Sequence, residues 1–550
     1  MKYRIKKFNE KADEISISTF HSFCYGYLYD FAPYVGYEMK FGIIDDDDKL
    51  KIIRNIIKEH ELDILDADAI KTISNVKNHT DTTYTSIDQA VKMNFIFHEY
   101  QAIILKNNKM DLDDLMYQFK NLLANYEALK EFLQEACEYI LVDECQDTNV
   151  IQYEILEIIS KKHNNLFMVG DQDQCIYTFR GSNLDNIKHF IETKQPKIIK
   201  LEENYRSNAN ILNVANNLIK NNNKRLDKTL YTNQFSKNYQ VIYAPLENSY
   251  EEARYIANLI IKLSDAGYLY QDIAVLYRNH AISNSFEKEL IRQKIPYKII
   301  GSYPFFKHKE IKTISNYYYF LNNKDDLSLN EIYAVPPRKI GDVTFSTLET
   351  DAKQLNTSIY EQMQLSTNEN IKAFVELIKK LETSFKTESP KDYIQVLLET
   401  IKYNDYLSKQ EKVKQKLSRI QDFIQMFAGL PNTEYPDQET IKFLNDIYLK
   451  PDETTDDKIV KLMTIHQAKG LEFKVVIIAG CNEGILPSFK ATNNDIEEER
   501  RIFYVAITRA KERLYLLSAN QRTLHGKIQT FKPSSFLKNM NLECIHLDKF

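Results

Sequence analysis

The sequence predicts an α/β fold with two parallel-sheet cores, each interrupted by a helical insertion. From residue 139 onward, short apolar and β-branched runs alternate with amphipathic stretches. Alternation of this kind is typical of a parallel sheet covered by helices. This alternation is absent from residues 49–106 and 309–450, where the pattern predicts mostly helices. At about 150 residues per domain, the chain of 550 residues has room for three or four domains.

Each predicted strand is a short apolar run between turn or helix patterns. Residues 15–24 predict a short strand that leads into a helix. Residues Asn208–Lys220 predict an amphipathic helix, because apolar side chains recur from Ile211 at positions i, i+1, i+4 and i+7. The other predicted strands are 139–142, 166–170, 197–201, 272–277 and 473–480.

Polar segments connect these elements. The acidic run Asp45–Asp48 predicts a solvated loop rather than a metal site, because no other ligand signal surrounds it. Within the second helical stretch, loops are expected at Val335–Gly341 and Gly429–Pro436. The acidic segment Pro451–Asp457 predicts a hinge before the β-rich pattern resumes.

Composition excludes several classes of protein. Hydrophobic residues are 43% and charged residues 27% of the chain, which excludes wholesale disorder. No apolar run approaches the roughly 20 residues needed to span a bilayer, so no membrane partner is expected. The first residues, MKYRIKKFNEKADE, are charged and have no apolar segment, unlike a secretory signal peptide. We therefore expect a cytoplasmic protein.

Charge and cysteine content restrict the chemistry further. The net charge is −5 and the isoelectric point is about 6.2, unlike a compact basic DNA-binding domain. A large enzyme can nevertheless carry a local basic groove. The six cysteines include no C-x-x-C pair, so neither a zinc ribbon nor a disulfide framework is predicted. Tryptophan is absent, so any stacking on bases must use phenylalanine, tyrosine or histidine.

The clearest early site signal is YILVDECQDTN at 139–149, where an apolar strand ends in Asp143 and Glu144. Ligands collect at the carboxyl ends of parallel strands. A carboxylate there can hold Mg²⁺, and its neighbour can activate a water molecule. The alternative is a polar turn after a strand, and these residues alone do not separate the two interpretations.

The segment LFMVGDQDQCIYTFRGS at 166–182 repeats the pattern of a strand followed by a polar loop. Gln174 is a candidate sensor of a γ-phosphate. Tyr177, Phe179 and Arg180 combine two rings with a cation, which suits single-stranded nucleic acid because bases stack on rings and phosphates pair with guanidinium groups. The alternative is that the rings belong to the protein core.

Two arginines follow later in the chain. Arg206 follows Tyr205 in LEENYRS at 201–207, and Arg509 is expected on the polar edge of an otherwise apolar helix in EEERRIFYVAITRAKERLYLL at 497–517. Lying in separate α/β segments, the two arginines are candidates to contact one phosphate together. For either arginine alone, a surface ion pair is the alternative.

These segments resemble, in order, motifs of the UvrD/Rep/PcrA-like superfamily 1 DNA helicases. The resemblance covers nearly the whole chain, and seven segments in the correct order exclude coincidence. The matching segments are STFHSF (18–23), ILVDECQDTN (140–149), VGDQDQCIYTFRGS (169–182), LEENYRS (201–207), AVLYRNHAISNSFEKELIRQKIPYKIIG (274–301), LMTIHQAKGLEF (462–473) and EEERRIFYVAITRAKERL (497–514).

The resemblance implies two RecA-like cores, each with a helical insertion subdomain, and an incomplete amino-terminal part of the first core. The implied division is 1–45 partial first core, 46–108 its insertion, 109–203 first core resumed, 204–308 second core, 309–455 its insertion and 456–550 second core resumed. The implied activity is ATP-dependent, 3′→5′ translocation on single-stranded DNA with unwinding at duplex junctions, as in DNA repair. The 309–455 insertion is a candidate surface for a protein partner.

The resemblance also implies roles for single residues, with ATP and Mg²⁺ as cofactors. Asp143 corresponds to the Mg²⁺ carboxylate, Glu144 to the catalytic base and Gln174 to the γ-phosphate sensor. Tyr205 corresponds to the residue that stacks on adenine, Arg206 and Arg509 to the γ-phosphate arginines, and Glu472 to the carboxylate on the nucleotide sugar. The implied DNA track or its coupling to ATP comprises Thr19, His21, Tyr177, Phe179, Arg180, Thr464 and His466. Many relatives have tryptophan where this chain has Phe179.

One expected motif does not occur in these 550 residues. The family's ATP site needs a P-loop, G-x-x-x-x-G-K-[S/T], whose amides and lysine bind phosphates. Of the 13 glycines only Gly526 precedes a lysine, and Lys527 is followed by Ile528. The opening MKYRI resembles the end of a helix that lies after the P-loop in relatives. We therefore expect that this sequence is a helicase without the amino-terminal part of its first core.

That interpretation has consequences and alternatives. A first core without its leading strand would expose a sheet edge and apolar surface, so we expect weak ATP binding and aggregation. The first alternative is a non-hydrolysing protein that binds DNA or a partner and retains the remains of a helicase site. The second is that a neighbouring polypeptide supplies the P-loop.

Overall fold

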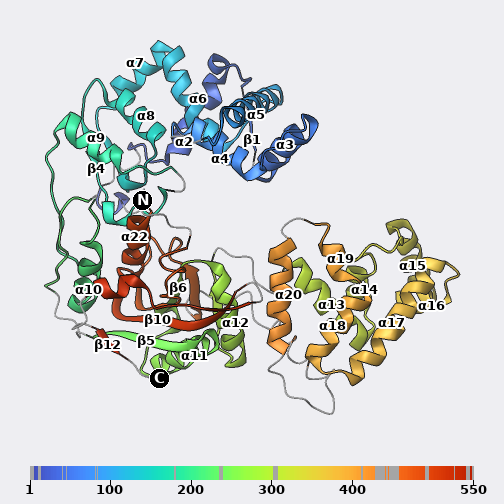
Figure 1. Cartoon of the computed structure of the whole chain (residues 1–550). Coiled ribbons are helices and arrows are strands. Elements are labelled where there is room, and N and C mark those ends of the chain that lie inside the picture. The colour runs from blue at the N-terminus through green and yellow to red at the C-terminus, as the bar shows by residue number, and fades with distance from the viewer. Residues whose placement is uncertain are drawn as a thin grey trace. The chain divides into compact units, whose positions relative to one another are not determined.

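The structure is a computed structural model, and it divides the chain into two compact units, Met1–Lys200 and Leu201–Phe550 (Figure 1). The two units are described separately below. The residues that the structure describes are 5–9, 14–39, 41–44, 46–80, 82, 84–178, 181–223, 225–233, 239–300, 308–410, 413–427, 440, 444, 458–489, 495–524, 527–540 and 545–547.

The first unit is mainly helical. Its helices are α2 (Phe20–Phe31), α3 (Asp46–Glu59), α4 (Asp66–Lys77), α5 (Ile87–Lys106), α6 (Leu112–Asn125), α7 (Glu127–Ala136), α8 (Val150–Ser160) and α9 (Asp185–Lys194). Its strands form two parallel pairs, β1 (Gly42–Ile43) with β2 (Lys109–Met110) and β3 (Ile140–Val142) with β4 (Leu166–Met168).

The β3–β4 pair brings two predicted site segments together. Leu141 of β3 lies opposite Phe167 of β4, so Asp143 and Gly170 follow the same edge of the pair. On one face, Val142 packs with Leu156 and Ile187. Side chains alternate along a strand, and on the opposite face Leu141 is 75% and Phe167 57% exposed.

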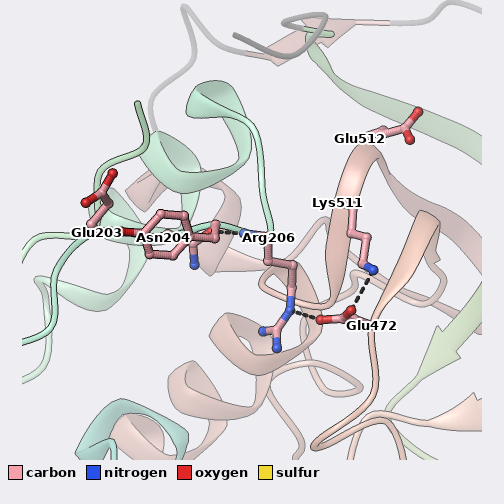
Figure 2. Close-up of a pocket in the computed structure, with 7 residues that line it drawn as sticks. Glu203, Asn204, Arg206, Glu472, Lys511 and Glu512 are labelled. Carbon is pink, nitrogen blue, oxygen red and sulfur yellow. Dashed lines mark hydrogen bonds and ion pairs between the residues drawn. The ribbon is translucent and has the colours of Figure 1, made fainter. Parts of the chain in front are cut away.

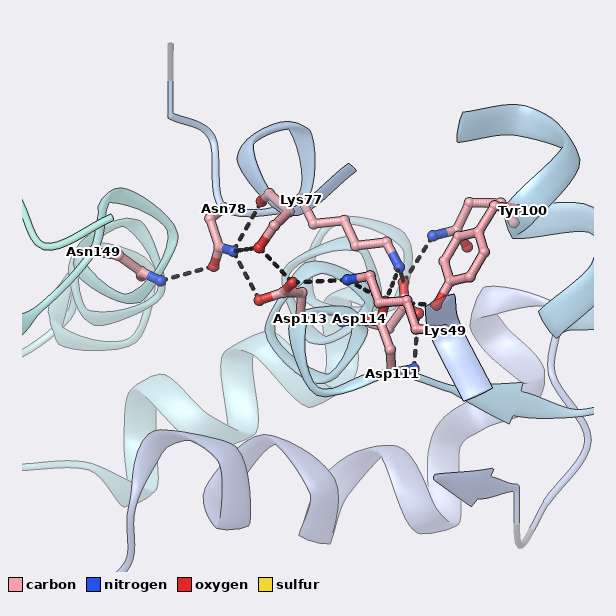
Figure 3. Close-up of polar contacts among 10 residues, drawn as sticks. Lys49, Lys77, Asn78, Tyr100, Asp111, Asp113, Asp114 and Asn149 are labelled. Carbon is pink, nitrogen blue, oxygen red and sulfur yellow. Dashed lines mark hydrogen bonds and ion pairs between the residues drawn. The ribbon is translucent and has the colours of Figure 1, made fainter. Parts of the chain in front are cut away.

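A buried ionic cluster joins the helices of the first unit (Figure 3). Lys77 at the end of α4 is fully buried and contacts Asp111 at 2.9 Å and Asp114 at 2.8 Å. Lys49 of α3 contacts Asp111 at 3.0 Å. The Tyr100 hydroxyl of α5 donates to Asp111 at 2.8 Å. The cluster therefore fixes α3, α4 and α5 to the amino-terminal end of α6.

The second unit contains an eight-stranded sheet among the described residues. Its order is β12-β5-β10-β9-β6-β8-β7, parallel throughout, and β11 pairs antiparallel with β10. The bounds are β5 (Val241–Asn248), β6 (Ile273–Tyr277), β7 (Tyr297–Ile299), β8 (Val460–Thr464), β9 (Phe473–Ile478), β10 (Ala510–Leu524), β11 (Lys527–Thr530) and β12 (Ile545–Leu547).

Helices cover both faces of this sheet. One cluster joins β6 and β9 residues such as Val275 and Ile477 to Ile256 of α11 (Ser249–Asp265) and Phe286 of α12 (Ser283–Arg292). The other face contacts α10 (Ala209–Ile219) and α22 (Ile496–Ile507), and Figure 1 shows α22 and α11 on opposite sides of the sheet. All five β6 residues are buried, as expected for a central parallel strand.

A second group of helices forms its own core within this unit. The helices are α13 (Lys309–Asn323), α14 (Asp326–Ile332), α15 (Asp342–Leu355), α16 (Ile359–Leu365), α17 (Glu369–Thr387), α18 (Pro390–Thr400), α19 (Tyr403–Leu407) and α20 (Val413–Phe427). Their apolar faces form one buried cluster that includes Tyr318, Phe374 and Phe423. Polar contacts add to this hydrophobic packing, because Arg419 of α20 pairs with the buried Glu310 of α13 and the Tyr318 hydroxyl donates to the Pro390 carbonyl at 3.1 Å.

The structure confirms several predicted elements. The α/β class with parallel sheets is confirmed, and the runs at 139–142, 166–170, 272–277 and 473–480 contain β3, β4, β6 and β9. The helix predicted at Asn208–Lys220 is α10, with Asn208 as its N-cap. The Val335–Gly341 loop joins α14 to α15. The predictions at Gly429–Pro436 and Pro451–Asp457 lie outside the described residues.

Three predictions are wrong. Residues 197–201 form no strand, and Ile199 is 66% exposed. No strand forms at 15–19 either, and α2 begins directly at Phe20. Both segments have strand-like composition, but no described strand pairs with them. The described part of the acidic run, Asp46–Asp48, is also helical rather than a loop, because α3 begins at Asp46, where negative charge favours a helix N-terminus.

Candidate nucleotide and DNA sites

Asp143 and Glu144 follow directly after β3. The backbone N–H of Glu144 donates to the Asp143 carboxylate at 3.0 Å, and Glu144 has a left-handed backbone with φ of 52°. Both side chains are exposed. Among the described residues no group of three or more His, Cys, Asp or Glu side chains could enclose a metal. Asp143 could nevertheless hold Mg²⁺, which keeps several waters and binds one or two carboxylates with substrate phosphates.

Gln174 belongs to a short 3₁₀ turn, Gln172–Gln174, that follows β4. Its side-chain amide donates to the Asp171 carboxylate at 2.9 Å, and the same carboxylate accepts the Asp173 N–H at 2.9 Å. The half-buried Gln174 therefore has a fixed orientation close to the end of β4.

Gly170, which follows β4, lies very close to Cys145 and Gln146 in the segment that follows β3. A Cβ added at Gly170 would overlap the Gln146 amide oxygen and lie 2.7 Å from Cys145 Sγ. We expect Gly170→Ala to lower the free energy of unfolding by about 1–3 kcal/mol, because a packed site must shift. Urea denaturation measures this. Gly26→Ala is the control, since nothing lies within 4 Å of the added Cβ and alanine favours a helix. An equal effect of both exchanges would contradict the prediction.

The first-unit residues of the predicted DNA track lie in two segments. Thr19 is the N-cap of α2, where its hydroxyl accepts the Ser22 N–H at 3.2 Å. His21 lies in the first turn of α2, and burial lowers its pKa. Tyr177 is half-buried after the Gln174 turn, while Phe179 and Arg180 lie outside the described residues.

A pocket of about 550 Å³ lies in the second unit (Figure 2). The loop at residues 204–208 and the start of β10 lie side by side at this pocket, and hydrogen bonds join them. The Ser207 hydroxyl donates to the Ala510 carbonyl at 2.6 Å, and the Asn208 N–H donates to the Lys511 carbonyl at 3.1 Å. The residues that line the pocket are Glu203, Asn204, Tyr205, Arg206, Glu472, Lys511 and Glu512.

One carboxylate in this pocket contacts two cations. Arg206 Nε donates to Glu472 Oε2 at 2.7 Å, and Lys511 Nζ contacts Glu472 Oε1 at 2.5 Å (Figure 2). Hydrogen bonds from Lys511 and Arg206 lower the pKa of Glu472 to about 2. Tyr205 is 68% exposed at the same pocket, so its ring is free to stack on a planar ligand. Two cations and an open ring suit a nucleotide with phosphates.

Arg509 lies close to the same loop but is not on a helix edge as predicted. Helix α22 ends at Ile507, and the Arg509 side chain is 1% exposed. Its guanidinium donates to the Val505 carbonyl at 3.0 Å and the Leu471 carbonyl at 3.2 Å. The helix ends before Arg509, so the side chain turns inward instead of facing solvent. Arg206 and Arg509, which lie far apart in the sequence, both belong to the second unit.

Thr464 and His466 lie at the carboxyl end of β8. The Thr464 hydroxyl donates to the Gln467 side chain at 3.0 Å, which closes a tight turn. Both Thr464 and His466 are half-buried. The structure thus brings Arg206, Arg509 and Glu472 to one region, and places Thr464 and His466 at a strand end of the same sheet.

Sequence reasoning missed three residues of these sites. Lys511 lies two residues after Arg509, and Asn204 lies two residues before Arg206. The Asn204 side chain accepts the backbone N–H groups of Arg206 at 2.9 Å and Ser207 at 2.8 Å, so it shapes the turn that presents Arg206. The third residue, Gln146, is buried between the two first-unit segments. All three lie inside segments that resemble family motifs, and that position in a motif is the signal that could have indicated them.

A search for membrane-crossing segments adds one observation. Within the part of the chain that the structure describes, no helix is both long and apolar enough to cross a membrane.

The structure is that of an α/β protein with parallel sheets and helical insertions, and comparison with known proteins shows its family. The UvrD/REP helicase N-terminal domain family matches residues 1–195, and the UvrD-like helicase C-terminal domain family matches residues 199–521. The chain therefore belongs to the UvrD-like helicase family.

Similar curated proteins support the same assignment. The ATP-dependent DNA helicase PcrA of Staphylococcus epidermidis strain ATCC 35984 is 35% identical over 571 residues, spanning 98% of this chain and 78% of the relative. The protein of the same name from Staphylococcus aureus strain Mu50 is 34% identical over the same shares.

Proposed function

We propose that this chain acts as an ATP-dependent DNA helicase that moves 3′→5′ on single-stranded DNA and opens duplex junctions. The observation that carries the proposal is the pocket in which Glu472 contacts both Arg206 and Lys511. A pocket with two cations around a carboxylate, beside an exposed tyrosine, suits a nucleoside triphosphate. The direction of movement and a role in DNA repair follow from the family resemblance, and we propose the cytoplasmic location from the composition of the chain.

The proposed roles use the chemistry of each side chain. Asp143 holds Mg²⁺, Glu144 accepts a proton from the attacking water, and Gln174 senses the γ-phosphate. Arg206 and Arg509 neutralise charge on the phosphates, and Tyr205 stacks on the base. Bound Mg²⁺ would offset charge that develops on the transferred phosphoryl group. The DNA track consists of Thr19, His21, Tyr177, Phe179, Arg180, Thr464 and His466, and the 309–455 insertion is a candidate partner surface.

A second candidate function is DNA binding without hydrolysis. It is the alternative to hydrolysis, since this class binds phosphates with the loop G-x-x-x-x-G-K-[S/T] and that loop lies outside residues 1–550 if the protein has it. The retention of Asp143, Glu144, Gln174, Arg206 and Arg509 favours hydrolysis instead.

The test compares hydrolysis with binding in the same preparation. ATP turnover is measured with and without oligothymidylate, and strand separation is measured on duplexes with a 3′ or a 5′ tail. DNA-stimulated turnover with separation from the 3′ tail supports the helicase, and Glu144→Gln should abolish both. Salt-sensitive DNA binding without turnover supports the second candidate. Reading the frame upstream of the Met1 codon shows whether a P-loop is encoded there.

A further inference from the structure

We propose that Gln146 is a positioning residue that connects the Glu144 carboxylate to the segment that carries Gln174. This inference rests on the proposed function, in which Glu144 is the base and Gln174 contacts the γ-phosphate. Gln146 has no role in the reaction chemistry described above. It acts through the orientation of two other side chains.

Gln146 makes one contact to each segment. Its side-chain N–H donates to Glu144 Oε2, and its side-chain oxygen accepts the backbone N–H of Asp171 at 2.8 Å. The Asp171 carboxylate in turn accepts the Gln174 amide at 2.9 Å. A continuous chain of hydrogen bonds therefore runs from Glu144 through Gln146 and Asp171 to Gln174.

The surroundings of Gln146 fit this connecting position. The side chain is 0% exposed, although Glu144 beside it is exposed. The absence of a side chain at Gly170 leaves the space that the Gln146 amide occupies. The Cys145 N–H donates to the Val169 carbonyl at 2.9 Å, so the backbone holds the two segments together independently of Gln146. The side chain of Gln146 is thus available to orient Glu144.

Both ends of the glutamine amide are needed for this connection. The glutamine amide donates to a carboxylate through its nitrogen and accepts a backbone N–H through its oxygen, and an apolar side chain of the same size can do neither. Glu144 is an exposed side chain, so without the bond it would sample other rotamers. Misplacement of a catalytic group by about 1 Å costs on the order of 10²-fold in rate. The alternative is that Gln146 only fills a buried space.

The first experiment tests the contact without using activity. Glu144→Ala and Gln146→Met each remove one partner of the contact, and the double variant removes both. The losses of stability of two side chains that bind each other do not add, because the second exchange removes a contact that the first has already broken. We expect the loss of melting temperature in the double variant to be smaller than the sum of the two single losses.

A second pair of variants is the matched control. Gln152 of α8 accepts the Asn149 N–H and donates to Met116 Sδ rather than to Glu144, so the losses of melting temperature in Glu144→Ala and Gln152→Met should add in their double variant. Additive losses in the pair Glu144→Ala and Gln146→Met would overturn the proposal.

The second experiment separates positioning from space-filling. Gln146→Met keeps the side-chain volume and removes both hydrogen bonds. We expect kcat for DNA-stimulated hydrolysis to fall about 10²-fold, with KM for ATP changed less than about threefold. An unchanged kcat would overturn the positioning role. If the unchanged chain shows no turnover, the proposed function fails, whereas the melting experiment still decides whether Gln146 binds Glu144.

Discussion

Arg206→Ala is expected to lower DNA-stimulated ATP hydrolysis by about 10³-fold, the lower end of the range for an arginine that stabilises phosphoryl transfer. Arg206 contacts Glu472 at 2.7 Å and its side chain is 30% exposed, so a ligand phosphate can replace the carboxylate as its partner. A guanidinium suits phosphate because it offers two parallel N–H donors. Steady-state turnover at saturating oligothymidylate measures the effect.

Two further variants make this result specific. Arg206→Lys keeps the charge but loses the bidentate geometry, so it should recover only part of the rate. Arg254→Ala removes an exposed arginine of α11 that lies over the Tyr250 ring, and it should leave turnover unchanged. Equal turnover of Arg206→Ala and Arg254→Ala would refute a role of Arg206 at the phosphate.

The fold was predictable where a local pattern is sufficient. Five consecutive apolar residues formed the central strand β6, and the spacing from Ile211 gave the helix α10. Residues 197–201 have a similar apolar pattern but form no strand. A strand depends on a hydrogen-bonded neighbour elsewhere in the chain, and the composition of one segment carries no information about that neighbour.

Contacts between distant residues of the candidate sites were also not predictable from local patterns. The motif containing Arg206 is separated by 266 residues from Glu472, its partner in the structure. The resemblance predicted both residues, but their direct contact depends on the tertiary fold. Arg509 was expected on a polar helix edge because the preceding residues are helical. The helix ends two residues earlier, and boundaries of this kind are the least predictable feature of a sequence.

Lys77→Met is expected to give the largest loss of stability, about 3–5 kcal/mol at pH 7.5, because it leaves the buried Asp114 without its cation and Asp111 with Lys49 alone. Lys77 is 0% exposed and contacts Asp111 and Asp114, while its ammonium lies 4.8 Å from the centre of the Tyr100 ring. Methionine has a similar volume, so the effect comes from charge rather than a cavity. Urea denaturation followed by circular dichroism measures the change.

The effect of Lys77→Met should depend on pH in a defined direction. Burial raises the pKa of Asp114 to about 6, even beside Lys77, so the folded state binds a proton more tightly than the unfolded chain. A carboxyl with a raised pKa contributes stability at low pH that is lost as the pH rises. Removal of Lys77 should raise this pKa further, so the variant gains more from acid than the unchanged chain. The deficit should therefore be smaller at pH 5.5 than at pH 7.5.

An exposed lysine provides the matched comparison for this cluster. Lys51 of α3 pairs with Asp48 at 3.4 Å, and its side chain is 72% exposed. Lys51→Met should change stability by less than about 0.5 kcal/mol with no dependence on pH between 5.5 and 7.5. A deficit in Lys77→Met that stays constant over this range would mean that lost packing dominates. A deficit that decreases in acid would instead identify the unpaired Asp114 carboxylate as its cause.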